Sequence, residues 1–271
     1  MLLTEAGEFG LIDRIKAVVA GSAENLVVGI DDDSAVFRTT GERLLLLTTD
    51  AFVEHVHFDF RYLSPAQLGW RALAANLSDI AAMGGEPVYA VVSLALPPQT
   101  RVEQVEAFYQ GMKTLADMFG TLVVGGDTTR SPGGWLVSVS VLGEVEQECL
   151  TLRSGAKVGD ALYVTGTLGG ARAGLAMLQT TERESSREVH PAIEKHVKPL
   201  PRVKEARYLV QHFAVHAMID ISDGLAPEVG HICRQSGTGA TILANRIPLD
   251  QATRRVARRL GDDPIHYALQ G

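Results

Sequence analysis

The sequence predicts an α+β protein built from two layered domains. Segments with the alternating pattern of strands follow one another directly in several places, which disfavours a strict β-α-β alternation. A polar break at residues 146–157 separates two halves, so we expect one domain at 1–147 and a second at 148–271. The chain of 271 residues, with 46% hydrophobic and 21% charged residues, is long enough to bury a sizeable core.

The first half is predicted to supply most of the strands. Residues 8–20 carry apolar side chains at helical spacing, and further helices are expected at 65–83 and 102–119. Ser64 and Gln67 form a capping box that marks the start of the helix at 65–83. Strands are expected at 26–30, 35–38, 43–50, 52–58, 88–96, 121–125 and 135–145.

The second half mixes short strands with helices. A strand at 161–165 is expected to run into the Gly-rich segment TGTLGGARAG, which then turns into a helix. A strand at 215–220 should precede a helix at 224–235, and a helix at 251–260 should expose a basic outer face. Residues 181–189 are polar, which is typical of a loop.

Charge and cysteine content disfavour several classes of protein. The formal net charge of −7, from 25 basic and 32 acidic residues, argues against a nucleic-acid-binding surface, which needs clustered Lys and Arg. Cys149 and Cys233 lie far apart, which argues against a disulfide framework and a structural zinc site. There is no cationic start typical of a signal peptide and no run of about 18 apolar residues. We therefore expect a cytoplasmic protein with no membrane partner.

Aspartates recur where predicted strands end. Asp50 closes the strand LLLLTTD, Asp127 lies in VVGGDTTR, and IDISDG contains Asp220 and Asp223. An acidic run at 31–33 follows an earlier strand in the same way. A carboxylate at a strand end lies on a rigid element and faces a cleft. Any one of these residues alone would be interpreted as a turn former or a helix cap, whereas the whole set indicates one shared site.

Asp79 gives a separate indication of a cation site. It lies inside the Ala-rich helix predicted at 65–83, where aspartate is unfavourable by propensity and has no compensating charge beside it. A metal ion is the natural partner for converging carboxylates, which otherwise repel one another. An all-oxygen set favours Mg²⁺ or Mn²⁺ over zinc, and the hydroxyls of Thr48 and Thr49 can add oxygen ligands.

Magnesium held by carboxylates usually serves a phosphate ligand. The sequence contains no Walker A motif, no G-x-G-x-x-G after a strand and no protein-kinase signature. TGTLGGARAG either holds a phosphate at a helix start or is purely structural. Arg153 either grips a phosphate or makes a surface ion pair. His55 and His57 should share one face of a strand at 52–58, and His57 is the histidine to which we assign a role.

A set of short motifs occurs in order along essentially the whole chain. They are GEFGLI (7–12), DDSA (32–35), TTD (48–50), VHF (56–58), NLSDIAAMG (76–84), GGDTTR (125–130), RSGAKVGD (153–160), YVTGTLG (163–169), KPLPR (198–202) and IDISDG (219–224). Together they resemble the thiamine-monophosphate kinase family, which belongs to the aminoimidazole-ribonucleotide-synthetase-like superfamily. NLSDIAAMG, GGDTTR and IDISDG are specific in combination.

The resemblance implies a homodimer of two-domain subunits, in which the N-domain sheet forms the dimer interface. It implies ATP-dependent phosphorylation of thiamine monophosphate to thiamine diphosphate with several Mg²⁺ ions. The implied metal ligands are Asp33, Thr48, Thr49, Asp50, Asp79, Asp127, Asp220 and Asp223. The implied ATP contacts are Gly126, Asp127, Arg153, Ser222 and Tyr109, and the implied contact with thiamine monophosphate is His57. The losses that should cost most activity are those of Asp50, Asp79, Asp127 and Asp220.

Two departures from the family pattern stand out. Asp31 occupies a position where the family usually has Gly, which adds charge and restricts the backbone. The family's Gly-Gly-Glu-Asp-Tyr motif and the segment after it are absent, because the sequence ends at HYALQG. We therefore expect either a substrate pocket that is open on one side or a longer protein of which this is a part.

The chemistry of the acceptor predicts the mechanism. A phosphate monoester is mostly a dianion near neutral pH, because its second pKa is about 6, so transfer needs no strong general base. It needs cations that neutralise both phosphate groups and hold them in line, and we expect direct transfer without a phosphoenzyme. The alternatives are another ATP-using member of the superfamily and a Mg²⁺-dependent phosphohydrolase. The run at 31–33 suggests the hydrolase, but GGDTTR does not supply its acid motif.

Overall fold

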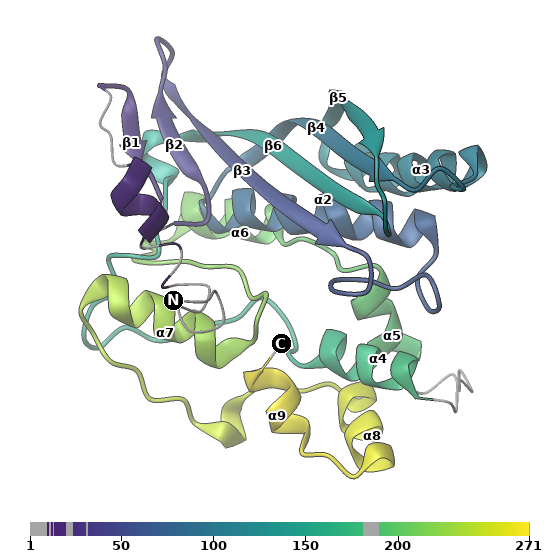
Figure 1. Cartoon of the computed structure of the whole chain (residues 1–271). Helices are drawn as coiled ribbons and strands as arrows, with labels where there is room; N and C mark the ends of the chain where they lie inside the picture. Colours follow the sequence, from purple (N-terminus) through teal and green to yellow (C-terminus); the bar gives the residue numbers. More distant parts are fainter. Residues whose placement is uncertain are drawn as a thin grey trace.

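The structure is a computed structural model that describes residues 10, 12, 14–19, 24–30, 32–180 and 190–270. Its centre is one mixed sheet in the order β1-β2-β3-β6-β4-β5 (Figure 1). The strands are β1 (Leu26–Val28), β2 (Ala35–Arg38), β3 (Arg43–Val53), β4 (Glu86–Leu96), β5 (Leu122–Arg130) and β6 (Leu136–Glu146). Neighbouring strands are antiparallel except β4 and β5, which are parallel and joined by a helical crossover.

Helices cover one face of this sheet. They are α2 (Pro65–Ala82), α3 (Val102–Phe119) and α6 (Val203–His212), and Figure 1 shows α2 lying along the sheet. α2 and α3 approach closely because Gly69 and Gly111 lie at their crossing, where any side chain would collide with the facing backbone. α6 belongs to the second half of the chain, yet Val203 and Ala206 pack into the core of the first half.

The alternating pattern of the strands separates the two faces of the sheet. In β6, Val137, Val139 and Val141 point into the core beneath α2, and Ser138 and Ser140 point the other way. We call this other side the open face, because no helix of the described chain covers it. Its apolar members are 40–60% exposed: Leu47, Tyr89, Val91, Leu122 and Leu136.

The second half is mostly helical. It contains α4 (Gly170–Gln179), α5 (His190–Val197), α7 (Leu225–Ser236), α8 (Gln251–Leu260) and α9 (Pro264–Leu269). These helices form a second layer, drawn below the sheet layer in Figure 1. The strands predicted at 161–165 and 215–220 are wrong, because both segments lack a hydrogen-bonded partner strand among the described residues. α8 was predicted correctly, with its arginines on the outer face.

The remaining elements of the first half lie near their predicted positions, but β3 and β5 run past the predicted ends at residues 50 and 125. Asp50 and Asp127 therefore lie within strands rather than at strand ends, and one predicted strand is cut short by a turn. The capping box of Ser64 and Gln67 is present at the start of α2. The strand predicted at 52–58 is wrong beyond Val53, because the chain turns there and His55 adopts a positive φ of 66°. The N–H groups of Val56 and His57 donate to the carbonyl of Val53, which closes the turn.

Parts of the prediction fall outside the described residues. The helix predicted at 8–20 is described only in part, and residues 14–19 are helical. Asp31 and the loop predicted at 181–189 lie outside the described residues. In the described part of the chain, we find no helix with both the length and the apolar composition that a bilayer crossing needs.

Candidate metal centre

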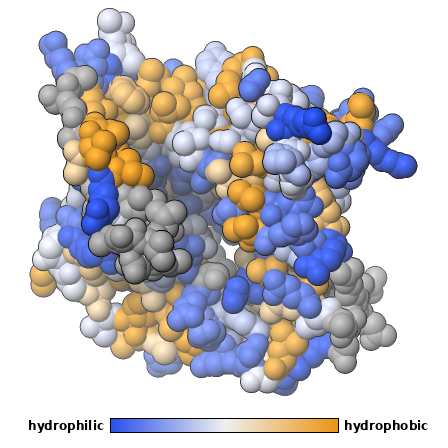
Figure 2. All heavy atoms as spheres, viewed as in Figure 1, coloured by the Kyte–Doolittle hydropathy of each residue, from blue (hydrophilic) through white to orange (hydrophobic). Residues whose placement is uncertain are grey.

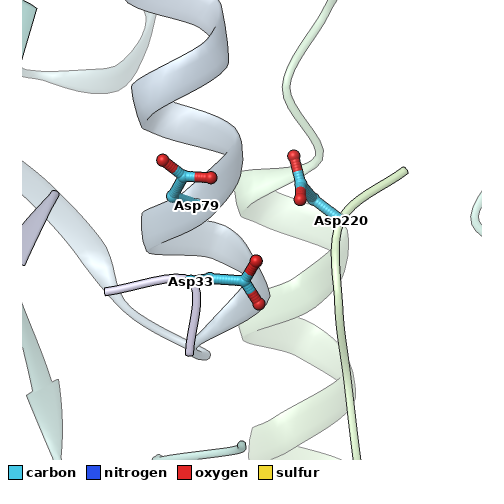
Figure 3. A group of neighbouring side chains, drawn as sticks. All are labelled: Asp33, Asp79 and Asp220. Carbon is cyan, nitrogen blue, oxygen red and sulfur yellow. The ribbon is translucent and has the colours of Figure 1, made fainter. Parts of the chain in front are cut away.

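Three carboxylates from distant parts of the chain meet between the two layers. Asp33 follows β1, Asp79 lies on α2, and Asp220 lies on the extended segment before α7. Each offers one carboxylate oxygen, and these oxygens all lie within 4.8 Å of one another. Figure 3 shows the three side chains around a common space. The structure thus brings together three of the predicted metal ligands.

Hydrogen bonds hold two of these carboxylates in place. The hydroxyl of Thr48 on β3 donates to Asp79 Oδ2 at 2.6 Å, which ties the sheet to α2 at the site. The side chain of Ser78, one residue before Asp79, hydrogen-bonds Asp220 from the other half of the chain. The Asp79 carboxylate is therefore fixed by β3, and the Asp220 carboxylate is fixed by α2.

Arg153 anchors the third carboxylate and the acidic residue before it. Its guanidinium donates to Asp33 Oδ1 at 2.5 Å, and its backbone N–H donates to the Asp32 carboxylate at 3.2 Å. Asp33 Oδ2 is buried and has no hydrogen-bond partner. A buried carboxylate oxygen without a partner is costly, and a bound cation would satisfy it.

Burial and mutual repulsion raise the pKa values of the cluster. Burial raises the pKa of Asp79 far above its usual range, and the charges of Asp220 and Asp50 raise it further. Burial and then the charge of Asp33 raise the pKa of Asp220. Burial also raises the pKa of Asp33, although Arg153 opposes the shift. A divalent cation between the carboxylates would remove this repulsion, and oxygen ligands suit Mg²⁺.

Asp50 and Thr49 both lie on β3 beside this cluster, but their side chains point to opposite faces of the sheet. Burial raises the pKa of Asp50, and its charge acts on Asp79, so Asp50 belongs to the edge of the site. Thr49 alternates with Thr48 and points to the open face, where its hydroxyl donates to the carbonyl of Val139 and accepts from Ser140. The structure therefore does not bring the Thr49 side chain to the three carboxylates.

Asp127 is separated from the cluster within one protomer. It lies on β5 and pairs with Ser93 of β4, whose side chain is exposed on the open face. Side chains paired in register share a face, so Asp127 also points to the open face. β6 and β4 lie between β3 and β5, which places Asp127 about 14 Å across the sheet from β3. Gly126 precedes Asp127 on the same strand, and Tyr109 lies on the neighbouring helix α3.

Ser222 and Asp223 are held by an acidic residue that the sequence did not indicate. The hydroxyl and N–H of Ser222 and the N–H of Asp223 donate to Glu228 Oε1 at 3.0–3.3 Å. Glu228 lies in the first turn of α7 and is buried. Its charge also reaches Asp33 and Asp220. Only its place in a first helical turn could have suggested this capping role.

His57 lies in the exposed turn after β3, near Asp50. The backbone N–H of Val53 donates to His57 Nδ1 at 3.0 Å. Because Nδ1 accepts a hydrogen bond, the neutral ring carries its proton on Nε2. The turn therefore presents His57 as a hydrogen-bond donor.

Comparisons with known proteins agree with this arrangement of two halves. The model described as "AIR synthase related protein, N-terminal domain" matches residues 31–145, and its C-terminal counterpart matches residues 157–269. A thiamine-monophosphate kinase of Aquifex aeolicus (strain VF5) is 39% identical over 271 residues, which is 100% of this chain and 84% of the relative. One from Bacillus subtilis (strain 168) is 40% identical, covering 82% of this chain and 69% of the relative.

Solved structures with a similar fold also include thiamine monophosphate kinases. The fold matches that of AaThiL complexed with AMPPCP and TMP with a TM-score of 0.91 at 38% identity, covering 100% of this chain and 84% of that chain. It matches thiamine monophosphate kinase from Aquifex aeolicus with a TM-score of 0.86 at 35% identity, covering 100% and 86% of the two chains. Hydrogenase maturation protein HypE in complex with ATP shares the fold alone, with a TM-score of 0.67 at 19% identity.

Proposed function

Because this chain belongs to the thiamine-monophosphate kinase family, we propose that it transfers the γ-phosphoryl group of ATP to the phosphate of thiamine monophosphate, which yields thiamine diphosphate. The observation that carries this proposal is the convergence of Asp33, Asp79 and Asp220 from both halves of the chain. A site with three close carboxylates would repel anionic phosphates unless cations came between them.

The residues present fit Mg²⁺. The donors are all oxygens, one of them buried without a partner, and Arg153 is the cation that pairs with the cluster in the described chain. Bound Mg²⁺ would neutralise the phosphate oxygens of both substrates. We assign Asp33, Asp79 and Asp220 as the central ligands, with Thr48 and Asp50 at the β3 edge and Asp223 beside α7.

The chain has little chemistry to perform beyond binding and alignment. Thiamine monophosphate near neutral pH carries its own nucleophilic oxygen, because its phosphate is mostly dianionic above about pH 6. No general base is required, and the attacking oxygen only has to face the γ-phosphorus opposite the leaving ADP oxygen. The protein holds both phosphate groups in this line and keeps the cleft between its two layers around them.

Individual side chains take the remaining roles. His57 donates from Nε2 to thiamine monophosphate, because its Nδ1 already accepts from Val53. Arg153 and Ser222 contact ATP from beside Asp33 and Asp220. Arg153 can exchange its bond to Asp33 for phosphate oxygens, which a guanidinium binds in a bidentate manner.

The remaining proposed ligands favour a homodimer. Thr49 and Asp127 point to the open face, and β6 and β4 separate their strands, so one protomer does not bring them together. Two open faces packed against each other would bury the exposed apolar side chains and place the Asp127 of one protomer near the Thr49 of the other. Gly126, Asp127 and Tyr109 would then serve the ATP bound mainly by the second protomer.

The test is incubation of the protein with ATP, Mg²⁺ and thiamine monophosphate, with separation of the thiamine phosphates and the nucleotides. We expect thiamine diphosphate and ADP in equal amounts. Release of inorganic phosphate without thiamine diphosphate would support a phosphohydrolase instead. An Asp79→Asn variant prepared in parallel excludes a contaminating kinase.

A further inference from the structure

One stripe of α2 is only half-buried and leads to the metal centre. Over its last three turns the helix is buried on every side except at Arg71, Ala75, Ser78 and Asp79. The last three follow Arg71 by four, seven and eight residues, so all four lie along one side of the helix. Figure 2 shows the molecule hollowed between the sheet layer and the helices below it. The stripe runs from Arg71 at one end to Asp79, at the metal centre, at the other end.

Arg71 is a cation without an anionic partner among the described residues. Its guanidinium makes one hydrogen bond, to His196 Nε2 on α5 at 3.0 Å, and no carboxylate pairs with it in the described chain. Burial lowers the pKa of Arg71, and burial also lowers the pKa of His196 to about 3. His196 is therefore neutral and accepts the bond, which leaves the positive charge of Arg71 uncompensated.

Arg71 has hydrogen-bond donors that His196 does not use. An arginine side chain has five N–H donors, and His196 accepts from one of them. None of the other nitrogen atoms of Arg71 is sealed from solvent without a partner. Burying most of a guanidinium beside a neutral histidine is unfavourable unless an anion completes the site.

We infer that Arg71 binds the phosphate group of the acceptor, thiamine monophosphate, and holds it against the metal ions bound at Asp79. This inference rests on the proposed function. About 12 Å of helix axis separates the two residues, a span that an arginine side chain, a phosphate group and a metal ion can fill together. Between them the stripe presents the small side chains of Ala75 and Ser78, which leave room for a ligand.

Two observations favour the acceptor over ATP. Arg153 already supplies a cation at Asp33, on the side assigned to ATP. Arg71 lies instead beside the segment that carries His57, because the ring of Tyr62 from this segment packs on His196 at 6.2 Å. The phosphate is the only anionic group of thiamine monophosphate, and the thiazolium ring would repel a guanidinium. Arg71 therefore contacts the phosphate rather than the ring.

The experiment compares ligands for the wild-type protein, Arg71→Met and Arg71→Lys. Arg38→Met is the matched control, because Arg38 is exposed on β2 and makes no side-chain bond within the described chain. Dissociation constants are measured by calorimetry with Mg²⁺ for thiamine monophosphate and AMPPCP, and KM values are measured for thiamine monophosphate and ATP. Thiamine, which lacks the phosphate, is used as a competitor of thiamine monophosphate.

Arg71→Met should raise the dissociation constant of thiamine monophosphate about 10- to 100-fold, the range expected for the loss of hydrogen bonds to a charged group. Arg71→Lys should recover part of this loss. The affinity for AMPPCP and the inhibition constant of thiamine should stay within about twofold, as expected without a lost contact. Equal weakening of AMPPCP and thiamine monophosphate would show that Arg71 only holds the two layers together. Equal weakening of thiamine and its monophosphate, or no weakening at all, would also overturn the inference. If the wild-type protein makes no thiamine diphosphate, the proposed function fails instead.

Discussion

The two faces of the sheet place aspartates in opposite environments. On the face covered by α2, Asp79 is buried with Asp33 and Asp220, and burial raises the pKa of each carboxyl. On the open face, Asp127 is exposed on an edge strand among partly exposed apolar residues. Asp127 and Asp220 were predicted from the ends of predicted strands, whereas Asp79 was predicted from its place inside a helix. Burial beside like charges marks a site that needs cations, whereas exposure beside apolar surface marks a site that needs a second protein surface.

The largest effect should come from the covered face. Asp79→Asn removes one of the three converging charges but keeps the size of the side chain. We expect the rate of thiamine diphosphate formation to fall at least about 1,000-fold, equivalent to about 4 kcal/mol, because cations that neutralise the phosphates would be lost. Asp117→Asn is the control, since Asp117 is exposed and, among the described residues, pairs only with Lys113. Turnover near the wild-type rate in Asp79→Asn at limiting Mg²⁺ would contradict this view of the covered face.

Mixing two inactive variants tests the open face. If each site combines Asp79 of one protomer with Asp127 of the partner, a dimer of one Asp79→Asn and one Asp127→Asn chain contains one intact site. Random exchange of equal amounts should then restore about a quarter of wild-type activity. The mixture is dissociated, reassociated and assayed beside each variant alone. Activity no higher than that of the separate variants would place Asp127 in its own protomer's site or outside any site.

The environment of Asp79 also predicts how stability depends on pH without metal. A carboxyl whose folded pKa is raised binds protons more tightly when folded, so its contribution to stability is lost as pH rises from about 4 through its folded pKa. In EDTA, the free energy of unfolding of the wild-type protein should therefore fall between acidic and neutral pH. This fall should exceed that of Asp79→Asn by at least about 1.4 kcal/mol, which corresponds to a shift of one pKa unit. Saturating Mg²⁺ should remove most of this difference.

Denaturant unfolding of both proteins at several pH values measures this effect. If the free energy of unfolding depends on pH in the same way in the wild type and Asp79→Asn, with or without Mg²⁺, the surroundings of Asp79 do not destabilise its ionised form.

The smallest expected effect lies outside both sites. Ser64 caps α2 through the N–H of Gln67, so Ser64→Ala should reduce the free energy of unfolding by about 1 kcal/mol. Because the cap lies far from Asp79 along the helix, the KM for ATP should not change. A large loss of activity at full stability would show that the start of α2 belongs to the site.

Much of the site could be predicted because its residues break local rules. An aspartate inside an Ala-rich helix is unfavourable by propensity, and this conflict alone indicates Asp79 in the amino-acid sequence. Asp220 lies beside the other two carboxylates even though its segment is not a strand. The acidic run at 31–33 and Arg153 were candidates from the sequence, and the resemblance to the family singled out Asp33. The pairing of Asp33 with Arg153 has no local pattern in the sequence.

Other features depend on contacts that no local pattern carries. The strand predicted through His57 is broken because the Asp59 carboxylate accepts from the N–H and guanidinium of Arg61 and contacts the ring of His55. Such local side-chain bonds compete with the sheet. Glu228 was missed because it acts only after α7 folds back on Ser222. Arg71 was missed because a single basic residue in a helix is ordinarily a solvated one.

The central claim is that Asp33, Asp79 and Asp220 together hold divalent cations that position phosphate groups. The most direct test is a crystal structure of the protein with Mn²⁺, AMPPCP and thiamine monophosphate, with the metal located by anomalous scattering. We expect at least one Mn²⁺ bound by carboxylate oxygens of this cluster and by a phosphate oxygen. Phosphates bound with no metal at the three aspartates, or Mn²⁺ found only elsewhere, would contradict the account.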